Sequence, residues 1–203
     1  MEMSGFQVLE FTGLQFTMFN VHGAKSRGVE LEVWGRITEA LSANFATTLV
    51  DAKYDKDCAT GIPAVNLSSV SRLCGYPLTN APEVAGVAGL TYDAALPGSG
   101  WGLVANVNAN YSSRRRTTTQ AVEANLTPIP FDYQDAYWKL NARLGFTAPG
   151  GRWSFELWGT NLTNEITAGL VANAPLRGLA GTRARIASVD EPRMYGMTLR
   201  TNF

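Results

Sequence analysis

The sequence has few charges and no long apolar run. Only 17% of its 203 residues are charged, whereas an ordinary soluble domain has about 25%. Lysine plus arginine and aspartate plus glutamate number 17 each, so no excess of positive charge indicates nucleic acid as a partner. No uninterrupted apolar stretch reaches the ~18 residues of a transmembrane helix. Strands that cross a membrane are still allowed, because their apolar and polar residues alternate and the mean hydropathy, here −0.06, averages out.

Alternation of apolar and polar residues is the dominant pattern. In the segment 137–147 the even positions are all apolar, while the odd positions read Tyr, Lys, Asn, Arg, Gly and Thr. The last segment, 195–203, alternates in the same way. Such a period of two indicates strands with a different solvent on each side. Eight candidate strands result, of which the first is the weakest, and they lie at about 6–20, 28–35, 41–54, 84–94, 101–112, 137–147, 153–159 and 195–203.

The connections between these segments alternate in length. Short turns are expected at 36–40, 97–100 and 148–151, and long polar loops at about 55–80, 113–133 and 162–190. Transmembrane barrels have strands of about 9 to 11 residues, short periplasmic turns and long external loops. The sequence therefore predicts an all-β, antiparallel, up-and-down transmembrane β-barrel segment. Six aromatic residues near strand ends are expected to form its interfacial girdles, namely Trp101, Tyr111, Trp138, Trp153, Tyr195 and Phe203.

The two cysteines, Cys58 and Cys74, fall in the first long loop. A disulfide between them would close a loop of about 17 residues and contribute about 3 kcal/mol in the loop-entropy model. It would also indicate an oxidising compartment such as the bacterial periplasm or cell surface. Two unpaired thiols are the alternative, and a zinc site would need further ligands, since the one histidine, His22, is distant in sequence.

At this point the residues carry a resemblance to a family. The stretches "GAKSRGVELEVWG", "LCGYPLTNAPEVAGVAGLTY", "YWKLNARLGF", "WSFELWGTNLTNE" and "EPRMYGMTLRTNF" are similar, in this order, to the carboxyl-terminal part of TonB-dependent outer-membrane receptors. The resemblance implies energy-dependent uptake of a scarce nutrient of the siderophore, cobalamin or oligosaccharide class. It also implies several partners: outer-membrane lipid, the remainder of the barrel and its plug, the TonB system and the barrel-assembly machinery. The implied location is the outer membrane of a Gram-negative bacterium.

The chain departs from a whole receptor in its length. Such a barrel has about 22 strands and a plugged lumen, whereas about eight strands are predicted here. Residues 1–20 lack the features of a secretory signal. We therefore expect residues 1–203 to be the carboxyl-terminal portion of the barrel, with the plug and earlier strands absent. A self-contained eight-stranded barrel with a structural or adhesion role is the alternative, and a soluble all-β binding module is a third reading.

Two further candidate sites follow from these patterns. Arg114, Arg115 and Arg116 open the second long loop, where they would contact lipopolysaccharide phosphate or an anionic substrate or simply face solvent. Outer-membrane barrels of the resembling kind end on an aromatic residue preceded by alternating apolar residues, which the assembly machinery recognises. That signal would comprise Tyr195, Met197, Leu199 and Phe203.

Several charged residues share the predicted lumen face. They would line a wet lumen or contact a passing solute, and they are Glu30, Glu32, Lys139, Arg143, Arg152, Glu156 and Arg200. His22 is expected near a tight external connection. The sequence shows neither a nucleophile with a base nor paired acids nor a phosphate loop, so we expect no enzymatic activity, no cofactor and no metal site.

Overall fold

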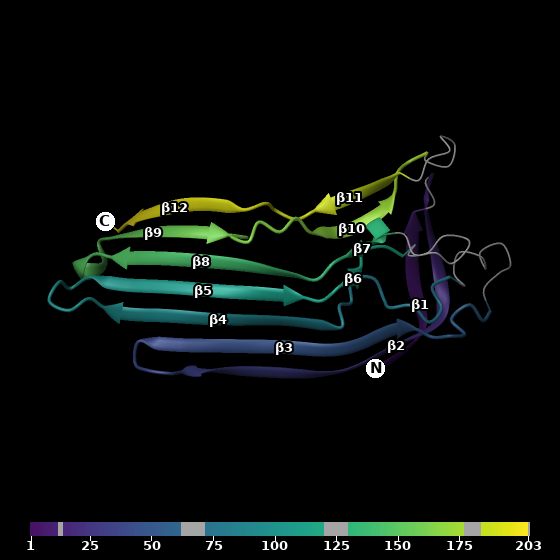
Figure 1. Ribbon diagram of the computed structural model, residues 1–203, viewed down its shortest axis with the longest axis horizontal. Coiled ribbons are helices and arrows are strands. Elements are labelled where there is room, and N and C mark those ends of the chain that lie inside the picture. Colours follow the sequence, from purple (N-terminus) through teal and green to yellow (C-terminus); the bar gives the residue numbers. More distant parts are fainter. Residues whose placement is uncertain (12–13, 62–71, 120–129, 177–183, 203) are drawn as a thin grey trace.

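The computed structural model describes residues 1–11, 14–61, 72–119, 130–176 and 184–202. Its main feature is one eight-stranded sheet in the order β1-β2-β3-β4-β5-β8-β9-β12. Every neighbouring pair is antiparallel. Figure 1 shows these long strands lying side by side. Their bounds are β1 (Glu2–Phe11), β2 (Phe16–Arg36), β3 (Leu41–Tyr54), β4 (Val84–Ala95), β5 (Gly102–Ser112), β8 (Tyr137–Thr147), β9 (Trp153–Thr160) and β12 (Met194–Thr201).

This architecture confirms the all-β, up-and-down prediction, but the first two strand boundaries were wrong. The segment 6–20 is not a single strand, because the chain reverses after Phe11 and β2 begins at Phe16. β2 then runs unbroken for 21 residues. It pairs with β1 over Phe16–Lys25 and with β3 over Ala24–Arg36, so neighbours on both sides extend its ladder. His22 consequently lies within a strand, and its backbone N–H donates to the Cys58 carbonyl at 2.8 Å.

The short connections gather at one end of the sheet. The connection after β8 contains the 3₁₀ turn η2 (Pro149–Gly151). Gly150 and Gly151 there have φ of 71° and 68°, in the left-handed region where a Cβ is disfavoured. The turn between β2 and β3 is closed by Thr38, whose hydroxyl accepts the Leu41 N–H at 3.0 Å. This end is the one expected to face the periplasm.

The long connections form a separate cluster of short elements at the opposite end of the sheet (Figure 1). Short elements pair within them, β6 with β7 and β10 with β11. The outer part of the β1–β2 hairpin rises at the same end. We call this assembly the outer region. Besides the outer part of the β1–β2 hairpin and the loop after β3, it contains β6 (Arg115–Arg116), η1 (Pro130–Asp132), β7 (Tyr133–Gln134), β10 (Ala168–Asn173) and β11 (Arg185–Val189).

The hydrophobic core of the described residues lies in the outer region and not against the long sheet. Val8 and Val21 of the β1–β2 hairpin pack with Tyr54 at the end of β3 and with the loop that follows β3. Phe19, Cys58 and Leu73 complete this buried cluster. In the long sheet, by contrast, large apolar side chains stay exposed. No helix in the described part of the chain is long and apolar enough to cross a membrane.

The sheet does not close on itself within the described residues. β1 and β12 stand at the two ends of the strand order. β12 pairs only with β9, and the lower part of β2, from Arg27 to Arg36, pairs only with β3. Two edges with free backbone hydrogen-bonding groups therefore run along the long sheet.

Candidate functional site

One face of the long sheet is an exposed apolar belt. Residues directly opposite each other on neighbouring strands share a face, and here Leu144 faces Leu157, which in turn faces Met197. The same belt continues to the other edge, where Val29 faces Leu49. Its large side chains are 37% to 75% exposed, including Val29, Leu31, Val33, Phe45, Leu49, Leu90, Val107, Leu144, Leu157, Met197 and Leu199. A soluble monomer rarely leaves so extended an apolar surface uncovered, and hydrocarbon is the solvent that suits it.

Aromatic pairs mark both borders of the belt. Trp101 and Trp153 stack edge to face at 4.7 Å near the short turns, and Tyr111 and Trp138 lie 4.7 Å apart toward the outer region. Ten residues separate Trp101 from Tyr111. At about 3.3 Å per residue and a strand tilt of about 40°, they span about 25 Å across the membrane, the height of the apolar band of outer-membrane barrels. Four of the six expected girdle residues thus form two girdle pairs.

The opposite face of the sheet is polar and carries a ladder of asparagine side chains. Asn106 donates to the Thr91 hydroxyl at 2.8 Å, and Asn141 donates to the Asn108 side-chain oxygen at 2.9 Å. The Asn141 oxygen accepts the backbone N–H of Asn161 at 2.8 Å. The asparagines of β5 are poor strand formers, and mutual hydrogen bonds on a wet face account for their presence. This is the face expected to line the lumen.

The charged residues expected to line the lumen lie on this polar face wherever they belong to a strand of the long sheet. Glu30 and Glu32 on β2 are on the face opposite to Val29 and Leu31. Arg143 lies 3.5 Å from Glu156 across β8 and β9. Arg152 is the exception among the seven, because it follows the turn η2 and precedes β9.

An ion pair ties the outer region to the lumen wall. Lys139 of β8 lies 2.8 Å from Asp190, in the connection between β11 and β12, and donates to the Thr167 hydroxyl at 2.6 Å. Hydrogen bonds from Lys139 and Thr167 hold the pKa of the Asp190 carboxyl below its ordinary value. The sequence did not indicate this contact, because Lys139 and Asp190 are 51 residues apart.

A second ion pair is buried inside the outer region. Arg185 of β11 lies 2.6 Å from Asp132 of η1, and their side chains are 7% and 0% exposed. Each buried charge of such a pair needs the other, because removal of one partner leaves the remaining charge unpaired in a low-dielectric site. The pair therefore fixes η1 against β11. No local sequence pattern predicts it, since the two residues are 53 positions apart.

The three arginines expected as an anion site take different positions. Arg114 is half-exposed, lies 3.5 Å from Asp135 and stacks over the Tyr133 ring. Arg115 donates to the Tyr137 hydroxyl at 3.0 Å. Arg116 is 1% exposed and donates to the Pro77 carbonyl at 2.7 Å, and burial lowers the pKa of its guanidinium. Arg115 and Arg116 thus make scaffold contacts in the outer region, and a ligand contact at this triplet stays a prediction.

The disulfide prediction is confirmed. Cys58 and Cys74 are bonded, and Cys58 is completely buried in the core of the outer region. Cys58 and Leu73, near the two ends of the loop that the bond closes, belong to one buried cluster with Val8 and Val21. The bond therefore joins the loop after β3 to the β1–β2 hairpin. Within the described residues no cluster of three metal-ligating side chains occurs.

The closing strand β12 carries the expected alternation. Tyr195, Met197 and Leu199 are each at least 67% exposed, and they face Gly159, Leu157 and Phe155 of β9 in order. Phe203 lies outside the described residues. The geometry places the three apolar side chains on the belt, and their role as an assembly signal stays a prediction.

Comparison with known proteins identifies the family. A family model described as "TonB dependent receptor-like, beta-barrel" matches residues 2–162. The chain belongs to this family. Its members are receptors of the Gram-negative outer membrane and not enzymes. The expected resemblance is therefore confirmed over most of the chain.

Solved structures of TonB-dependent receptors share the fold. The ferric yersiniabactin uptake receptor FyuA from Yersinia pestis has a TM-score of 0.70 at 16% identity, covering 92% of this chain and 25% of that one. The ferric-catecholate import receptor Fiu from E. coli K12 has a TM-score of 0.61 at 17% identity, with 100% and 24% covered. BauA, the ferric preacinetobactin receptor from Acinetobacter baumannii, has a TM-score of 0.59 at 16% identity, with 96% and 25% covered.

The chain spans about a quarter of the length of these TonB-dependent receptors. At such low identity the similarity concerns the fold alone. No curated protein sequence matches the chain.

Proposed function

We propose that this chain is the carboxyl-terminal wall of a TonB-dependent outer-membrane receptor that takes up a scarce nutrient. The observation that carries the proposal is an open sheet with one apolar face and one polar face. The belt of Val29, Leu144 and Met197 suits lipid, and the asparagine ladder suits a water-filled or plugged lumen. A wall of this kind acts only within a complete barrel.

The open edges favour a larger barrel over a self-contained one. In hydrocarbon an unpaired strand edge leaves N–H and C=O groups without partners, each at a cost of several kcal/mol. An eight-stranded barrel would pair its first and last strands, whereas among the described residues β12 pairs with β9 alone. The free edges of β12 and of Arg27–Arg36 therefore suit further strands of the same receptor. The plug and the TonB contact would belong to those other parts.

The substrate class that we favour is a ferric siderophore. FyuA, Fiu and BauA are all described as receptors for ferric ligands of this class. The lumen face agrees with it, because neutral amides such as Asn108 and Asn141 can hydrogen-bond to a large polar solute without holding it tightly. Cobalamin and oligosaccharides are the other classes that the family takes up.

Assembly in the outer membrane would use the closing strand. We propose that Tyr195, Met197, Leu199 and Phe203 form the signal that the barrel-assembly machinery reads. Three of these side chains are exposed on the belt face, where a binding partner can reach them before lipid does.

The test is made on outer membranes of the source organism grown with and without iron. An antibody against residues 14–36 should detect a heat-modifiable protein about four times as long as this chain, since the chain covers 25% of FyuA. Its amount should rise under iron starvation. Deletion of its gene should abolish uptake of radioactive iron supplied as one or more ferric siderophores, while uptake of ferrous iron stays normal as the control.

Two outcomes would contradict the proposal. A heat-modifiable band with the 21.9 kDa mass of this chain alone would indicate a self-contained small barrel. A full-length receptor whose deletion impairs cobalamin or oligosaccharide uptake, and no ferric uptake, would overturn the substrate class only.

A further inference from the structure

We propose that a charged pocket on the outer wall of the barrel binds the phosphate groups of lipopolysaccharide in the outer leaflet. The pocket has a volume of about 440 Å³ and lies between β2 and β3 where the apolar belt ends. Four cations line it, Lys25, Arg27, Lys53 and Lys56, and we call them the cationic collar. The inference rests on the proposed outer-membrane location, and it is independent of the transported substrate.

The strand register places the collar on the lipid side of the wall. Lys25 faces Lys53 across the β2–β3 pair. Four residues along β2 from Lys25, on the same face, Val29 faces Leu49, and these two side chains are 68% and 51% exposed. A ligand at the collar would therefore have an apolar surface directly below its anionic group. That is the shape of a phosphorylated lipid, and it differs from that of a solute in the lumen.

The depth of the collar matches the outer border of the membrane. Arg27 and Arg36, which lies beside the short turn, are nine positions apart. At about 3.3 Å per residue and a tilt of about 40°, that segment rises about 23 Å. The apolar band of such barrels is about 25 Å tall. Arg27 thus lies at the level of the outer headgroups, with Lys25 and Lys56 just beyond it.

The charges of the pocket are arranged to accept an anion. Lys25 and Lys53 are like charges directly opposite each other, an arrangement that destabilises a strand pair. Three acids on the same pocket offset the four cations in part, and they are Asp51, Asp55 and Asp57. Within the described residues Lys25 lies 3.4 Å from Asp55 and 3.9 Å from Glu2 of β1, and Lys53 lies 2.8 Å from Asp51. A phosphate between the two lysines would relieve their repulsion.

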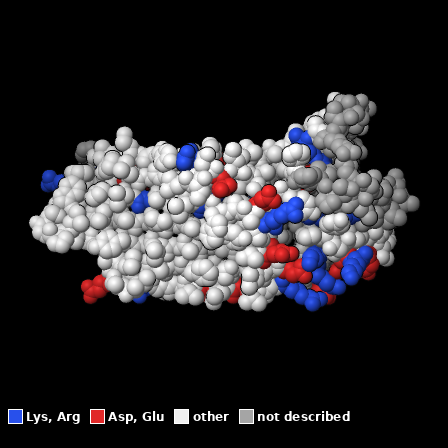
Figure 2. Space-filling view, viewed as in Figure 1, with Lys and Arg blue, Asp and Glu red and all other residues white. Residues whose placement is uncertain are grey.

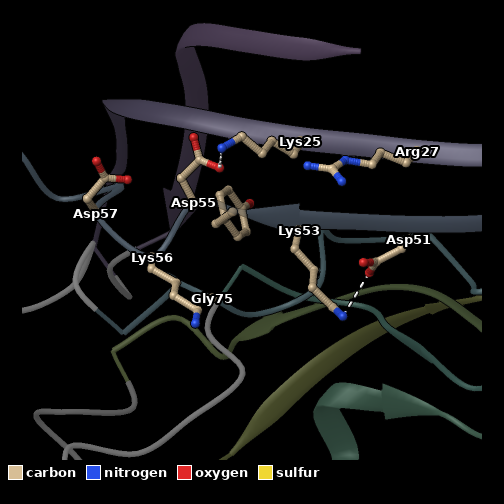
Figure 3. A pocket seen from close by; sticks show the side chains of 9 residues that line it. Lys25, Arg27, Asp51, Lys53, Asp55, Lys56, Asp57 and Gly75 are labelled. Atoms are coloured by element: carbon tan, nitrogen blue, oxygen red, sulfur yellow. Dashed lines mark ion pairs between the residues drawn. The ribbon is translucent and has the colours of Figure 1, made fainter.

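Two of the collar cations are available for such a phosphate. In the described part of the chain Arg27 and Lys56 form no ion pair, and Arg27 is exposed. Figure 3 shows Lys25 and Arg27 on β2, with Lys25 directed toward Asp55, and Lys53 beside Asp51 on the paired strand β3. The Asp51 side chain is 63% exposed, so its pairing with Lys53 is weak and exchangeable. Arginine suits phosphate because its fork donates two parallel hydrogen bonds.

The collar is a local feature of the surface. Figure 2 shows charged side chains of both signs gathered at the end of the molecule where β2 meets the outer region, while the middle of the same view is mostly uncharged. Anionic lipid is attracted to basic groups close to the membrane plane. A charge cluster restricted to the headgroup level is what such attraction requires.

The experiment measures binding of lipid A to the full-length receptor that contains this chain. Purified, folded receptor in nanodiscs is titrated with fluorescent diphosphoryl lipid A, with lipid A lacking both phosphates, and with inorganic phosphate as competitor. The triple variant Lys25→Gln, Arg27→Gln and Lys53→Gln should weaken diphosphoryl lipid A binding at least tenfold. The unchanged receptor should bind lipid A without phosphates only weakly. Its affinity for that lipid should be no higher than the affinity of the triple variant for diphosphoryl lipid A.

Two control variants separate the collar from charge and size in general. Arg143→Gln with Arg200→Gln removes cations from the lumen face and should leave lipid A binding unchanged. Lys25→Arg with Lys53→Arg keeps the collar charge and should retain binding. Binding by the unchanged receptor should weaken as salt is raised, because exposed charges are screened.

The outcomes are decisive for the collar. Equal binding of diphosphoryl lipid A by the receptor and the triple variant would overturn the proposal. Displacement of lipid A by inorganic phosphate at comparable concentration would show a site for free phosphate and would overturn the lipid assignment. If the receptor is folded and heat-modifiable in the outer membrane but fails these binding tests, only the proposal for the collar is refuted. If the protein is absent from the outer membrane, the proposed function is refuted.

Discussion

The indole of Trp158 on β9 covers Gly196 on β12. The two residues face each other in the strand register, and a Cβ added to Gly196 would clash with the Trp158 ring. The Trp158 N–H reaches the Thr198 hydroxyl at 3.3 Å. The ring therefore bridges the last two strands on the polar face and uses the space that glycine leaves.

Replacing Gly196 with alanine should destabilise the closing strand pair. A methyl group at this position forces the Trp158 ring out of its place, and overpacking of this kind costs about 1 to 3 kcal/mol. Unfolding of the full-length receptor in urea, followed by tryptophan fluorescence, would measure the loss. Gly102→Ala is the matched control, because its added Cβ would meet Thr147 at an ordinary 3.6 Å. An equal effect of both substitutions would contradict the bridging role of Trp158.

Adjacent positions on β3 should differ sharply in their tolerance of arginine. Phe45 lies on the apolar belt and is 45% exposed, whereas Ala46 faces Val87 on the polar side and lines a groove there. Phe45→Arg should destabilise the folded receptor by about 2 to 4 kcal/mol if it lies at the membrane midplane, and Ala46→Arg by much less. Equilibrium unfolding in lipid vesicles tests both. Similar losses would mean that the two faces are assigned wrongly.

Loss of the disulfide should loosen the outer region and leave the membrane sheet intact. Replacing Cys58 and Cys74 with alanine removes a bond of about 3 kcal/mol for a loop of this length. Limited proteolysis should then cut the loop after β3 faster, while the heat-modifiable band remains. Reductant should reproduce the effect in the unchanged protein and have no effect on the double variant. Free thiols that react with iodoacetamide without reductant would show that the bond does not form.

The attachment of the β11–β12 connection should depend on acid pH. Because the folded-state pKa of Asp190 is lowered from 3.8, its contribution to stability is fully present above that value and is lost as the pH falls through the lower folded pKa. Hydrogen exchange of residues 185–193 should therefore rise only at strongly acid pH. Asp190→Asn should show the faster exchange at every pH, and an unchanged profile in this variant would exclude the Lys139 contact as the cause.

Deletion of Phe203 should reduce the amount of receptor in the outer membrane. If the closing strand is an assembly signal, the inserted fraction should keep its melting temperature while its quantity falls. Quantitative immunoblots of outer membranes, with and without heating, separate the two effects. Normal insertion together with a lower melting temperature would instead make Phe203 an interfacial anchor.

Much of the wall could be predicted from the sequence, because each strand face has its own solvent. Leu144 and Arg143 are neighbours in the chain and differ in polarity, so the alternation shows the side of each. The first hairpin could not be predicted in this way. β1 and the start of β2 leave the membrane, where both faces of a strand meet protein or water and the alternation weakens.

The outer region was the least predictable part. Its ion pairs, Lys139 with Asp190 and Arg185 with Asp132, join residues more than 50 positions apart. The short-range alternation of apolar and polar residues in the sequence carries no information about such contacts. The disulfide was the exception, because Cys58 and Cys74 share one loop and the sequence contains no other cysteine.

The length of β2 has a mechanical consequence. Its 21 residues have a contour length of about 70 Å at about 3.3 Å each, and they carry one continuous ladder of hydrogen bonds to the neighbouring strands. Because this ladder continues through the bend by which β2 leaves the long sheet (Figure 1), the outer hairpin and the wall share one set of backbone hydrogen bonds. A force applied to the outer hairpin would therefore reach the barrel wall through those bonds.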